Sequence, residues 1–575
     1  MIWFLNDPAR IAREQAAVGA LAVEYDWLTD IDWGFDASAR LKLDFAITVG
    51  GERFPLRMTY PKLFPHTPPD VTTVDPDKRV SEHQYIGGNL CLQYRPDNWQ
   101  SAITGADMIR STHELLSTER PPEGPPREVQ SAHRQTEGQA FRWKSLRFLV
   151  TGDLNELLPR LSEGAALSAE IRLSTHAQCT TASVGKIKLE DGTDWSPQGQ
   201  PKLGTAYRGV IARIPSSELA VLAADADGTL AGAARNRIAE TMGFTEYADR
   251  EFLLATDGKT ILLWWQLSAA KNDITTFSSL MIEAGGGRRL SDGYESLTGK
   301  KVAVVGCGSA GSKIAVSLAR SGVGSFVLID DDLFLRDNLV RHDLDWRSVG
   351  EHKVDGVLRR IRMVNPTAEV KVRRLSLTGQ ESAGSAASAL DQVAECDVIV
   401  DATADADAFN LLASIAMAAK KPMIWFEVFA GGIGGLVARY RPGKDQTPQL
   451  MRNAFRTWCR DQGVPWTEDD VGRYGARDGE GAVLVADDGD VSVIAAHATR
   501  MATDLLVEED AFPHSMYVLS LRSGWLFSEP FEAYPIDVQS TPEAAAAPPD
   551  PAAVTEGLNF IGELLGKASD EAAAS

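Results

Sequence analysis

The amino-acid sequence predicts an α/β multidomain protein, with an α+β domain at the N-terminus, a second α+β domain in the middle and a parallel-sheet domain toward the C-terminus. Residues 301–332 predict the parallel sheet, because they read as a strand over 301–305, a glycine turn, a helix and a second strand over 325–329. Residues 8–60 read as one helix followed by a strand meander. The proline-rich stretch RPPEGPPR at 120–127 indicates a boundary between this N-terminal region and the rest of the chain.

Helix and strand signals follow one another in the N-terminal domain, expected over 1–122. Asp7 is suited to cap the first helix, and Pro8 is suited to its first position. The expected elements are a helix over 8–22, strands on both sides of a Gly50-Gly51 hairpin turn, an extended proline-rich segment over 60–69 and a helix over 103–118.

Cys91 is the candidate nucleophile of this domain. Two glycines and Asn89 precede it in the segment GGNLCL at 87–92, so we expect a loop there. Most free cysteines are small buried hydrophobic residues. A thiol in an accessible loop is instead available to attack an acyl group, and the sequence therefore favours catalysis by Cys91.

The middle of the chain carries no motif that indicates a function. A proline-rich linker and a polar helix are expected over 123–145, followed by an α+β domain of unknown role over 146–285. Strand-like runs alternate there with turns, and one helix interrupts them. The expected strands lie near 169–177, 184–192, 207–214 and 260–267, and the expected helix lies at 231–242.

Three glycines stand in the spacing GxGxxG after the strand expected over 301–305. Gly306 and Gly308 let the backbone turn tightly and approach a phosphate, and Gly311 lets the following helix pack on the strand. The amides at the start of that helix would point at an anion, where the helix dipole also favours negative charge. The segment therefore predicts a nucleotide-binding turn.

Polar residues beyond the second strand decide which nucleotide is expected. Asp330 and Asp332 follow that strand, where an acid is placed to hold a ribose hydroxyl. Up to this point NAD would fit as well as ATP. Asn338, Arg341 and Lys353 come next, and such groups favour a triphosphate, because cations neutralise the charge that builds on phosphates.

The glycine turn, the D-x-D-x5-N-L-x-R-H block over 330–342 and Lys353 together resemble the adenylation domain of ubiquitin-activating (E1) and ThiF/MoeB-type enzymes. The resemblance implies a Rossmann-like domain, expected over 286–538, that uses ATP and forms a homodimer. It implies that a C-terminal carboxylate attacks the α-phosphate of ATP. Arg341 and Lys353 would stabilise the phosphates, and Asp330 would hold the ribose.

The same resemblance implies a magnesium ligand and a second thiol. Family members place an Asp in a D-x-x-D-N motif after the strand that we expect near 396–401, whereas this chain reads DATADAD at 401–407. We select Asp405 as the Mg²⁺ ligand, with Asp401 as the alternative. Family members also carry a cysteine on a loop that crosses the nucleotide. Cys459 is the candidate, and the alternative is a cysteine packed within a helix.

The N-terminal domain resembles a ubiquitin-conjugating (E2) domain, which has the UBC fold. The resemblance rests on the proline-rich Y-P-x-x-x-P-x-x-P-P turn from Tyr60, the segment G-x-L-C-L at 88–92 and Trp99. It implies that Cys91 carries a thioester.

One feature departs from the eukaryotic E2 pattern. Those domains carry His-Pro-Asn before the cysteine, and the Asn supports the oxyanion. Here His83 is followed by Gln84-Tyr85. Asn89 is either a substitute or a plain turn residue, and we favour the turn residue.

Taken together, the two resemblances imply an E1–E2 fusion like those of CBASS antiphage operons. Its substrate would be the C-terminus of a ubiquitin-like modifier or of a CD-NTase-type partner, which would be joined to a target lysine. Three alternatives stay open: a sulfur-carrier adenylyltransferase without conjugation, an NAD-dependent oxidoreductase, and a scaffold with an inactive E2-like domain.

Composition argues against several other functional classes. The chain has 575 residues, with 58 basic and 79 acidic side chains and a net charge of −21, which argues against a nucleic-acid partner. Its apolar stretches are too short to span a membrane, and its N-terminus lacks the pattern of a secretory signal. Five cysteines without a CxxC pair fit the cytoplasm and argue against a zinc knuckle. A last strand is expected over 524–530, followed by a disordered tail over 539–575 with a short helix over 558–566.

Overall fold

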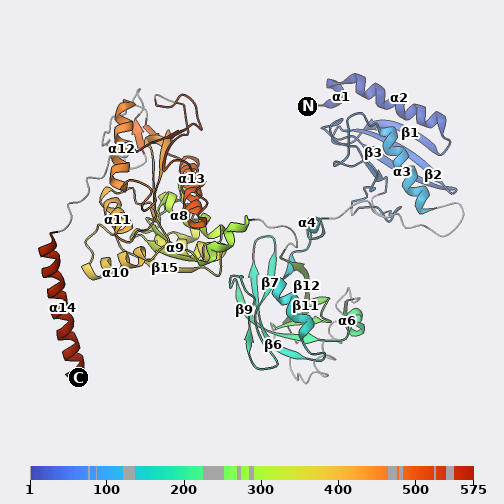
Figure 1. Cartoon of the computed structure of the whole chain (residues 1–575). Helices are drawn as coiled ribbons and strands as arrows, with labels where there is room; N and C mark the ends of the chain where they lie inside the picture. Colours follow the sequence, from blue (N-terminus) through green and yellow to red (C-terminus); the bar gives the residue numbers. More distant parts are fainter. Residues whose placement is uncertain are drawn as a thin grey trace. The chain divides into compact units, whose positions relative to one another are not determined.

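The chain divides into two compact units, Met1–Trp143 and Lys144–Ser575 (Figure 1). The computed structural model describes residues 2–75, 78–85, 87–120, 136–223, 251–268, 273–283, 290–463, 475–477, 483–523, 526–538 and 550–574. The mixed α/β, multidomain class that the sequence predicts is confirmed.

The first unit packs helices against a four-stranded antiparallel meander, in the strand order β1-β2-β3-β4. Asp7 caps α2 by accepting a hydrogen bond from the Arg10 amide, and Pro8 begins that helix, as expected. Gly50 and Gly51 form the β2–β3 turn with positive φ. The elements are α1 (Trp3–Asn6), α2 (Pro8–Glu24), β1 (Leu28–Phe35), β2 (Leu41–Val49), β3 (Glu52–Thr59), β4 (Asp70–Thr73), α3 (Gly105–Glu119) and α4 (Glu137–Ala140). Most of the linker helix expected over 123–145 lies outside the described residues.

A buried carboxylate joins the parts of this unit. Glu14 of α2 is fully buried and accepts hydrogen bonds from the Arg10 guanidinium at 2.9 Å, the Tyr60 hydroxyl at 3.0 Å and the Gly105 amide at 2.6 Å. The last of these bonds lies at the start of α3. Because a buried charge is costly without partners, this network fixes α2 against α3 and against the segment that leads to the Cys91 loop.

The middle region forms an eight-stranded sheet in the order β5-β12-β11-β10-β9-β6-β7-β8, which closes on itself because β5 also pairs with β7. Its interior holds one core of buried side chains that includes Phe148, Phe252 and Phe277. The expected helix at 231–242 lies outside the described residues. The elements are β5 (Leu146–Val150), α5 (Gly152–Leu157), η1 (Leu158–Arg160), β6 (Ala166–Thr175), β7 (Thr180–Lys188), β8 (Asp194–Trp195), β9 (Thr205–Arg213), α6 (Ser216–Ala223), β10 (Glu251–Thr256), β11 (Ile261–Ser268) and β12 (Asp273–Met281).

The C-terminal region is built on a second eight-stranded sheet, in the order β15-β14-β13-β16-β17-β18-β21-β22. The first five strands are parallel, and the last three are antiparallel. The strands are β13 (Lys301–Val305), β14 (Ser325–Ile329), β15 (Glu369–Arg373), β16 (Val398–Asp401), β17 (Met423–Val428), β18 (Gly434–Tyr440), β21 (Met516–Ser520) and β22 (Ala533–Pro535).

Helices cover both faces of this sheet (Figure 1). α8, α9 and α13 pack on the face that carries Val302 and Val304, whereas α10, α11 and α12 pack on the face that carries Ala303 and Val305. The helices and short pieces are η2 (Asp292–Gly299), α8 (Ser309–Arg320), η3 (Arg336–Val340), η4 (Trp346–Ser348), α9 (Lys353–Val364), α10 (Ala383–Ala394), α11 (Ala406–Ala418), η5 (Ala430–Gly432), α12 (Pro448–Asp461), the hairpin β19 (Gly475–Arg477) and β20 (Val483–Val485), and α13 (Asp488–Val507).

The described part of the tail, 550–574, differs from the expectation of disorder. Helix α14 spans Pro551–Ala574, where the sequence predicts a short helix over 558–566. Asp550 accepts a hydrogen bond from the Ala552 amide, Pro551 begins the helix, and the alanine-rich sequence that follows has high helix propensity.

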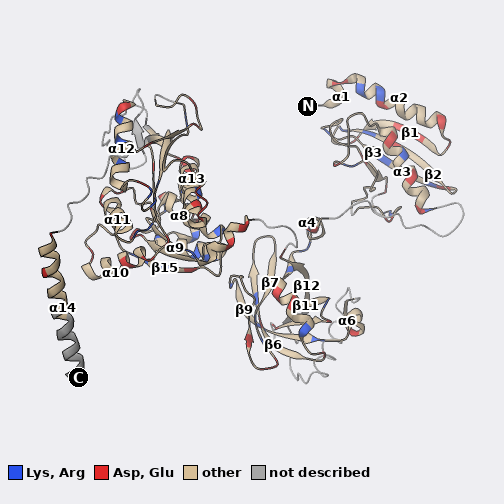
Figure 2. Ribbon diagram, viewed as in Figure 1, with Lys and Arg blue, Asp and Glu red and all other residues tan. Residues whose placement is uncertain are grey.

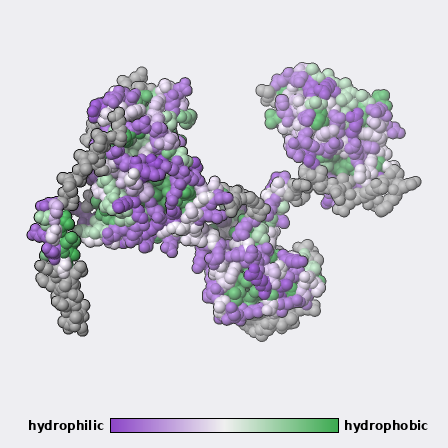
Figure 3. All heavy atoms as spheres, in the orientation of Figure 1, coloured by the Kyte–Doolittle hydropathy of each residue, from purple (hydrophilic) through white to green (hydrophobic). Residues whose placement is uncertain are grey.

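Surface composition varies between elements. Basic and acidic side chains are interspersed along α2 (Figure 2), and the described part of α14 exposes apolar side chains beside hydrophilic ones (Figure 3). Among the described residues, no helix combines the length and the apolar composition that crossing a membrane requires.

Candidate functional site

A cavity of about 500 Å³ lies at the carboxyl ends of β13, β14 and β16. In parallel sheets a ligand binds where the strand order reverses, and here the order reverses between β13 and β16. The lining residues at the strand ends are Val305, Gly306, Ile329, Asp330, Asp331, Asp332, Ala402 and Thr403, and residues 375–378 after β15 complete this edge.

The glycines at the turn have the backbone conformation and close packing that a tight strand-to-helix turn requires. Gly306 has φ +87°, and a Cβ there would lie 2.6 Å from the Ala402 carbonyl oxygen. A Cβ on Gly311 would lie 1.9 Å from the Gly306 carbonyl oxygen, so α8 packs too closely for a side chain. Gly308 precedes α8 in open space and lines the cavity. The backbone at Gly308 is therefore accessible to a ligand.

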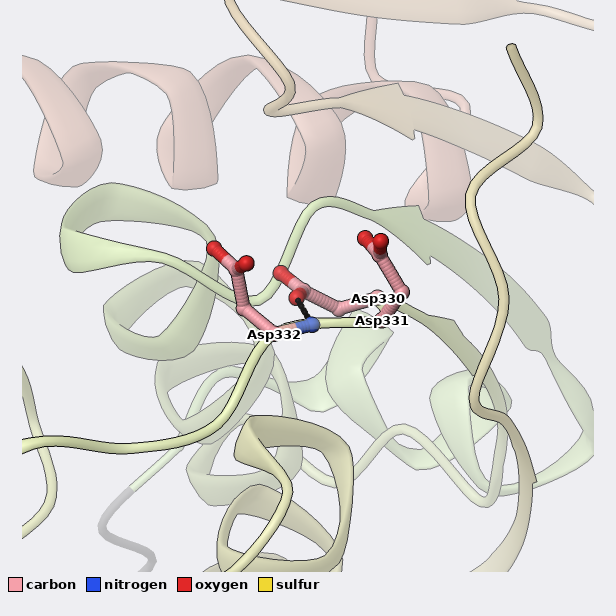
Figure 4. A group of neighbouring side chains, drawn as sticks. All are labelled: Asp330, Asp331 and Asp332. Carbon is pink, nitrogen blue, oxygen red and sulfur yellow. Dashed lines mark hydrogen bonds between the residues drawn. The ribbon is translucent and has the colours of Figure 1, made fainter. Parts of the chain in front are cut away.

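Three consecutive acids follow β14, and one oxygen of each lies within 4.8 Å of the others (Figure 4). Asp330 is the most enclosed of the three. Its carboxylate accepts hydrogen bonds from the Cys307 amide at 2.6 Å and from the Asp332 amide at 2.8 Å, and burial raises its pKa. Asp330 therefore ties the glycine turn to the end of β14, while Asp331 and Asp332 remain exposed.

The three polar residues that favour a triphosphate all line the same cavity. Lys353 begins α9, and its ammonium lies 2.6 Å from the Asp332 carboxylate. Arg341 donates a hydrogen bond to the Ala486 carbonyl at 3.1 Å. Asn338 accepts a hydrogen bond from the Leu335 amide through its side-chain oxygen. The structure thus brings these residues together with the acids and the glycine turn.

Sequence reasoning missed the role of His342, the last residue of the block that contains Arg341. Its Nε2 lies 2.8 Å from the Cys307 carbonyl oxygen, and its Nδ1 accepts a hydrogen bond from the Leu344 amide at 3.1 Å. Burial lowers the pKa of His342 to about 4, so the ring is neutral at pH 7. These contacts assign the proton to Nε2, which donates to the glycine turn.

The two candidate metal ligands lie in different surroundings. Asp405 lines the cavity and caps α11 by accepting hydrogen bonds from the Asp407 and Ala408 amides. Asp401 is buried and absent from the cavity lining; it accepts two hydrogen bonds from Thr403, and burial raises its pKa to about 6. Of the two candidate ligands, Asp405 is therefore the one whose side chain lines the cavity.

The C-terminal region holds two cysteines that bear on the second-thiol expectation. Cys459 lies on α12 with an exposed fraction of 4%, packs in the core with Phe455, and burial raises its pKa to about 11. Cys307, inside the glycine turn, is fully buried. Reactive thiols are accessible and have lowered pKa values. The surroundings of Cys459 and Cys307 are instead typical of cysteines packed in a core.

Cys91 lies in the first unit beside a separate cavity of about 1190 Å³. Cys91 is half-buried, and its sulfur accepts a hydrogen bond from the Tyr85 hydroxyl at 3.7 Å. The Asn89 side chain is hydrogen-bonded to Asp70, which supports its reading as a structural turn residue. Cys91 is thus accessible, as a thiol nucleophile must be.

Comparisons with known proteins agree with the geometry of the C-terminal region. Residues 288–457 match the ThiF family. The chain is 25% identical to the protein y4qC of Sinorhizobium fredii over 486 residues, 78% of this chain and 77% of that protein. It is 33% identical to the ATP-dependent ubiquitin transferase-like protein Cap2 of Enterobacter hormaechei over 137 residues, 24% of this chain and 22% of Cap2.

Among solved structures, the chain is similar to E. coli MccB with ATP, with a TM-score of 0.33 and 19% identity, over 44% of this chain and 68% of that one. The stretch of Cap2 that this chain matches is less than a quarter of that protein. The family match instead spans the glycine turn, the acids, Arg341 and Lys353. This part of the chain is therefore a ThiF-family, E1-like adenylation domain.

Proposed function

We propose that this protein activates the C-terminal carboxylate of a peptide or protein with ATP and then transfers the acyl group to Cys91. The observation that carries the proposal is the single cavity in which an open glycine turn faces Asn338, Arg341 and Lys353. An anion is favoured at the start of α8, and fixed cations beside it favour a polyphosphate.

ATP fits the groups that line this cavity. A Cβ on Gly308 would meet nothing within 4 Å, and Gly308 lies at the N-terminus of α8, where amides bind phosphate. The exposed Asp332 carboxylate lies beside the turn and suits a ribose hydroxyl. Asp330 instead supports the turn itself, because both of its oxygens accept backbone hydrogen bonds.

In the first step a carboxylate oxygen of the substrate attacks the α-phosphorus of ATP. The bond from that phosphorus to the bridging oxygen breaks, and pyrophosphate leaves with the electron pair. Negative charge builds on the phosphate oxygens. Lys353, which contacts Asp332 without nucleotide, and Arg341 are the cations that stabilise this charge.

Asp405 is the residue that would hold Mg²⁺. Its carboxylate lines the cavity, and its position is fixed by the two amides that it caps. One carboxylate fits the ion, because Mg²⁺ takes most of its oxygen ligands from phosphates and water. When bound, the ion would neutralise phosphate charge and assist departure of pyrophosphate.

In the second step the Cys91 thiolate attacks the acyl carbon, the carbon–oxygen bond to AMP breaks, and AMP leaves with the electron pair. A primary amine, such as a target lysine, then attacks the thioester and forms an amide, which frees the thiolate. Half-burial beside a large cavity supports this role for Cys91, whereas the buried Cys459 lacks such access.

The proposed substrate is the C-terminus of a ubiquitin-like protein or of a CD-NTase-type partner, in the setting of antiphage defence, with the protein acting as a homodimer. The similarity to Cap2, described as an ATP-dependent ubiquitin transferase-like protein, supports this class. The E2-like order of helix, meander and cysteine loop supports conjugation rather than activation alone.

The test of adenylation is ATP–pyrophosphate exchange by the full chain with Mg²⁺ and proteins encoded beside its gene. Lys353→Ala should reduce exchange by about 100-fold or more, because a transition-state cation is lost. Lys371→Ala removes an exposed lysine of β15 outside the cavity and should leave exchange unchanged. Equal exchange by wild type and Lys353→Ala would refute the assignment of the cavity.

A further inference from the structure

The loop that presents Cys91 also presents Tyr85. The Cys91 amide donates to the His83 carbonyl at 2.7 Å, and the Tyr85 amide donates to the Asn89 carbonyl at 2.8 Å. The two residues thus stand on opposite arms of one short hairpin-like loop. The Tyr85 hydroxyl reaches across it to Cys91 Sγ, at 3.7 Å. Both residues line the cavity of about 1190 Å³.

The side chain of Gln84 holds this loop in place. Its carbonyl oxygen accepts a hydrogen bond from the Val80 amide at 2.8 Å, and its amide group lies 3.2 Å from the carbonyl oxygens of Lys78 and Gly88. Gln84 on the first arm is therefore bonded both to Gly88 on the second arm and to the preceding segment at 78–80. The backbone that carries Tyr85 is thus held before any substrate arrives, and a donor on a fixed backbone suits electrostatic stabilisation of a transition state.

The asparagines that lie closest to Cys91 in the sequence, Asn89 and Asn98, are engaged elsewhere. The Asn89 side chain bonds to Asp70. The Asn98 side chain accepts from the Arg95 amide at 2.7 Å and donates to the Gln93 carbonyl at 2.8 Å. Both serve the loops that frame the cavity. The Tyr85 hydroxyl, in contrast, is directed at the sulfur itself.

We propose that the Tyr85 hydroxyl is a catalytic donor to the carbonyl oxygen of an acyl group carried on Cys91; this inference rests on the proposed function. The acyl oxygen of a thioester is separated from sulfur by one carbon, so rotation of the Cys91 side chain can bring that oxygen within reach of a hydroxyl that contacts the sulfur. An amine attacks the acyl carbon, the carbonyl electrons move to oxygen, and Tyr85 stabilises the oxyanion. The carbon–sulfur bond then breaks, Cys91 leaves as thiolate, and the amine proton passes to water.

The protonation state of Tyr85 suits a donor. Partial desolvation of the phenol and its hydrogen bond to the Cys91 thiol raise the pKa of Tyr85 above its ordinary value. The hydroxyl therefore keeps its proton at neutral and mildly alkaline pH, where amines attack thioesters. The side chain is 55% exposed, so removal of its oxygen leaves the core of the unit intact.

The experiment bypasses ATP. Full-length protein is acylated with an excess of the acetyl-Gly-Gly thioester of mercaptoethanesulfonate, and acylation of Cys91 is located by peptide mass mapping. After removal of the probe, free lysine is added and loss of the Cys91 thioester is timed. Tyr85→Phe should slow this loss by about tenfold or more, since one oxyanion donor is removed. Tyr25→Phe, the same change at a remote site of the unit, should match wild type.

Alkylation of Cys91 by iodoacetamide separates catalysis from a structural effect, because that reaction forms no oxyanion. Tyr85→Phe should leave the alkylation rate within about twofold of wild type, since a long O–H···S contact is weak. An equal fall in alkylation and lysine transfer would overturn the proposal. Equal lysine transfer by wild type and Tyr85→Phe would overturn the role of Tyr85 and leave the proposed function standing. Failure of wild-type Cys91 to accept the acetyl-Gly-Gly group would refute both the role of Tyr85 and the proposed function.

Discussion

The hydrogen bonds of His342 lead to a quantitative prediction. His342→Leu keeps a side chain of comparable size but removes the donor to the Cys307 carbonyl and the acceptor of the Leu344 amide. Cys307 is fully buried and Leu344 nearly so. Each group left unpaired costs about 1–3 kcal/mol, so the substitution should destabilise the adenylation domain by about 2–6 kcal/mol.

The pH dependence of stability tests the same contacts. The pKa of His342 is about 4 in the folded chain, against 6.5 for an ordinary histidine. The unfolded state then binds the proton more tightly, so stability is fully present above pH 6.5 and is lost as the pH falls toward 4. For this buried ring the loss amounts to about 3 kcal/mol. His342→Gln keeps a donor but cannot titrate, and it should lack this loss.

Differential scanning calorimetry of the full-length protein between pH 4 and 7.5 measures both effects, through the transition assigned to the adenylation domain. The assignment comes from the transition that ATP shifts upward, because a ligand that binds the native state stabilises it. If His342→Leu unfolds within 0.5 °C of wild type, or if His342→Gln loses stability with acid as wild type does, the role given to His342 is refuted.

Three further outcomes are expected. Gly311→Ala should weaken ATP binding by titration calorimetry and lower the melting temperature, since its Cβ would lie 1.9 Å from a backbone oxygen; unchanged binding would contradict the packing of α8. Glu14→Ala should destabilise the first unit by about 3 kcal/mol in thermal unfolding, because Arg10 stays buried without its partner; a loss below 1 kcal/mol would argue against the network. Cys459→Ala should retain ATP-dependent acylation of Cys91 by intact-mass analysis, and its complete loss would restore Cys459 as an acyl carrier.

Local signals predicted much of the C-terminal fold. Strands β13 and β14 have the bounds that the sequence indicates, because buried parallel strands are short apolar runs and the glycine spacing fixes where the turn begins. The sequence also predicted that Asn338, Arg341 and Lys353 would share a site with the glycine turn, and the structure places them in one cavity.

Features that depend on long-range pairing were missed. The sequence predicted a strand over 524–530, but the described part of that stretch, 526–530, is not a strand. The last strands of the sheet are instead β21 and β22. β21 is fixed by its pairing with β18, about 80 residues earlier in the chain, and no local pattern marks that pairing. Closure of the middle sheet likewise depends on β5 meeting both β12 and β7.

Side-chain direction was the other limit of sequence reasoning. Asp401 and Asp405 lie four residues apart, yet Asp405 faces the cavity and Asp401 bonds to Thr403. Ala404 between them has φ +53°, which turns the chain in a way that the letters DATADAD do not reveal. His342 was passed over for a similar reason, since a histidine after Arg341 gives no sign of contacting a loop 35 residues earlier.

The most direct measurement is intact-mass analysis, without reducing agent, of the full chain incubated with ATP, Mg²⁺ and each protein encoded beside its gene. The account predicts AMP release together with an adduct on Cys91 that dithiothreitol removes and that Cys91→Ala lacks. AMP release with an unmodified Cys91 for every such protein would contradict it.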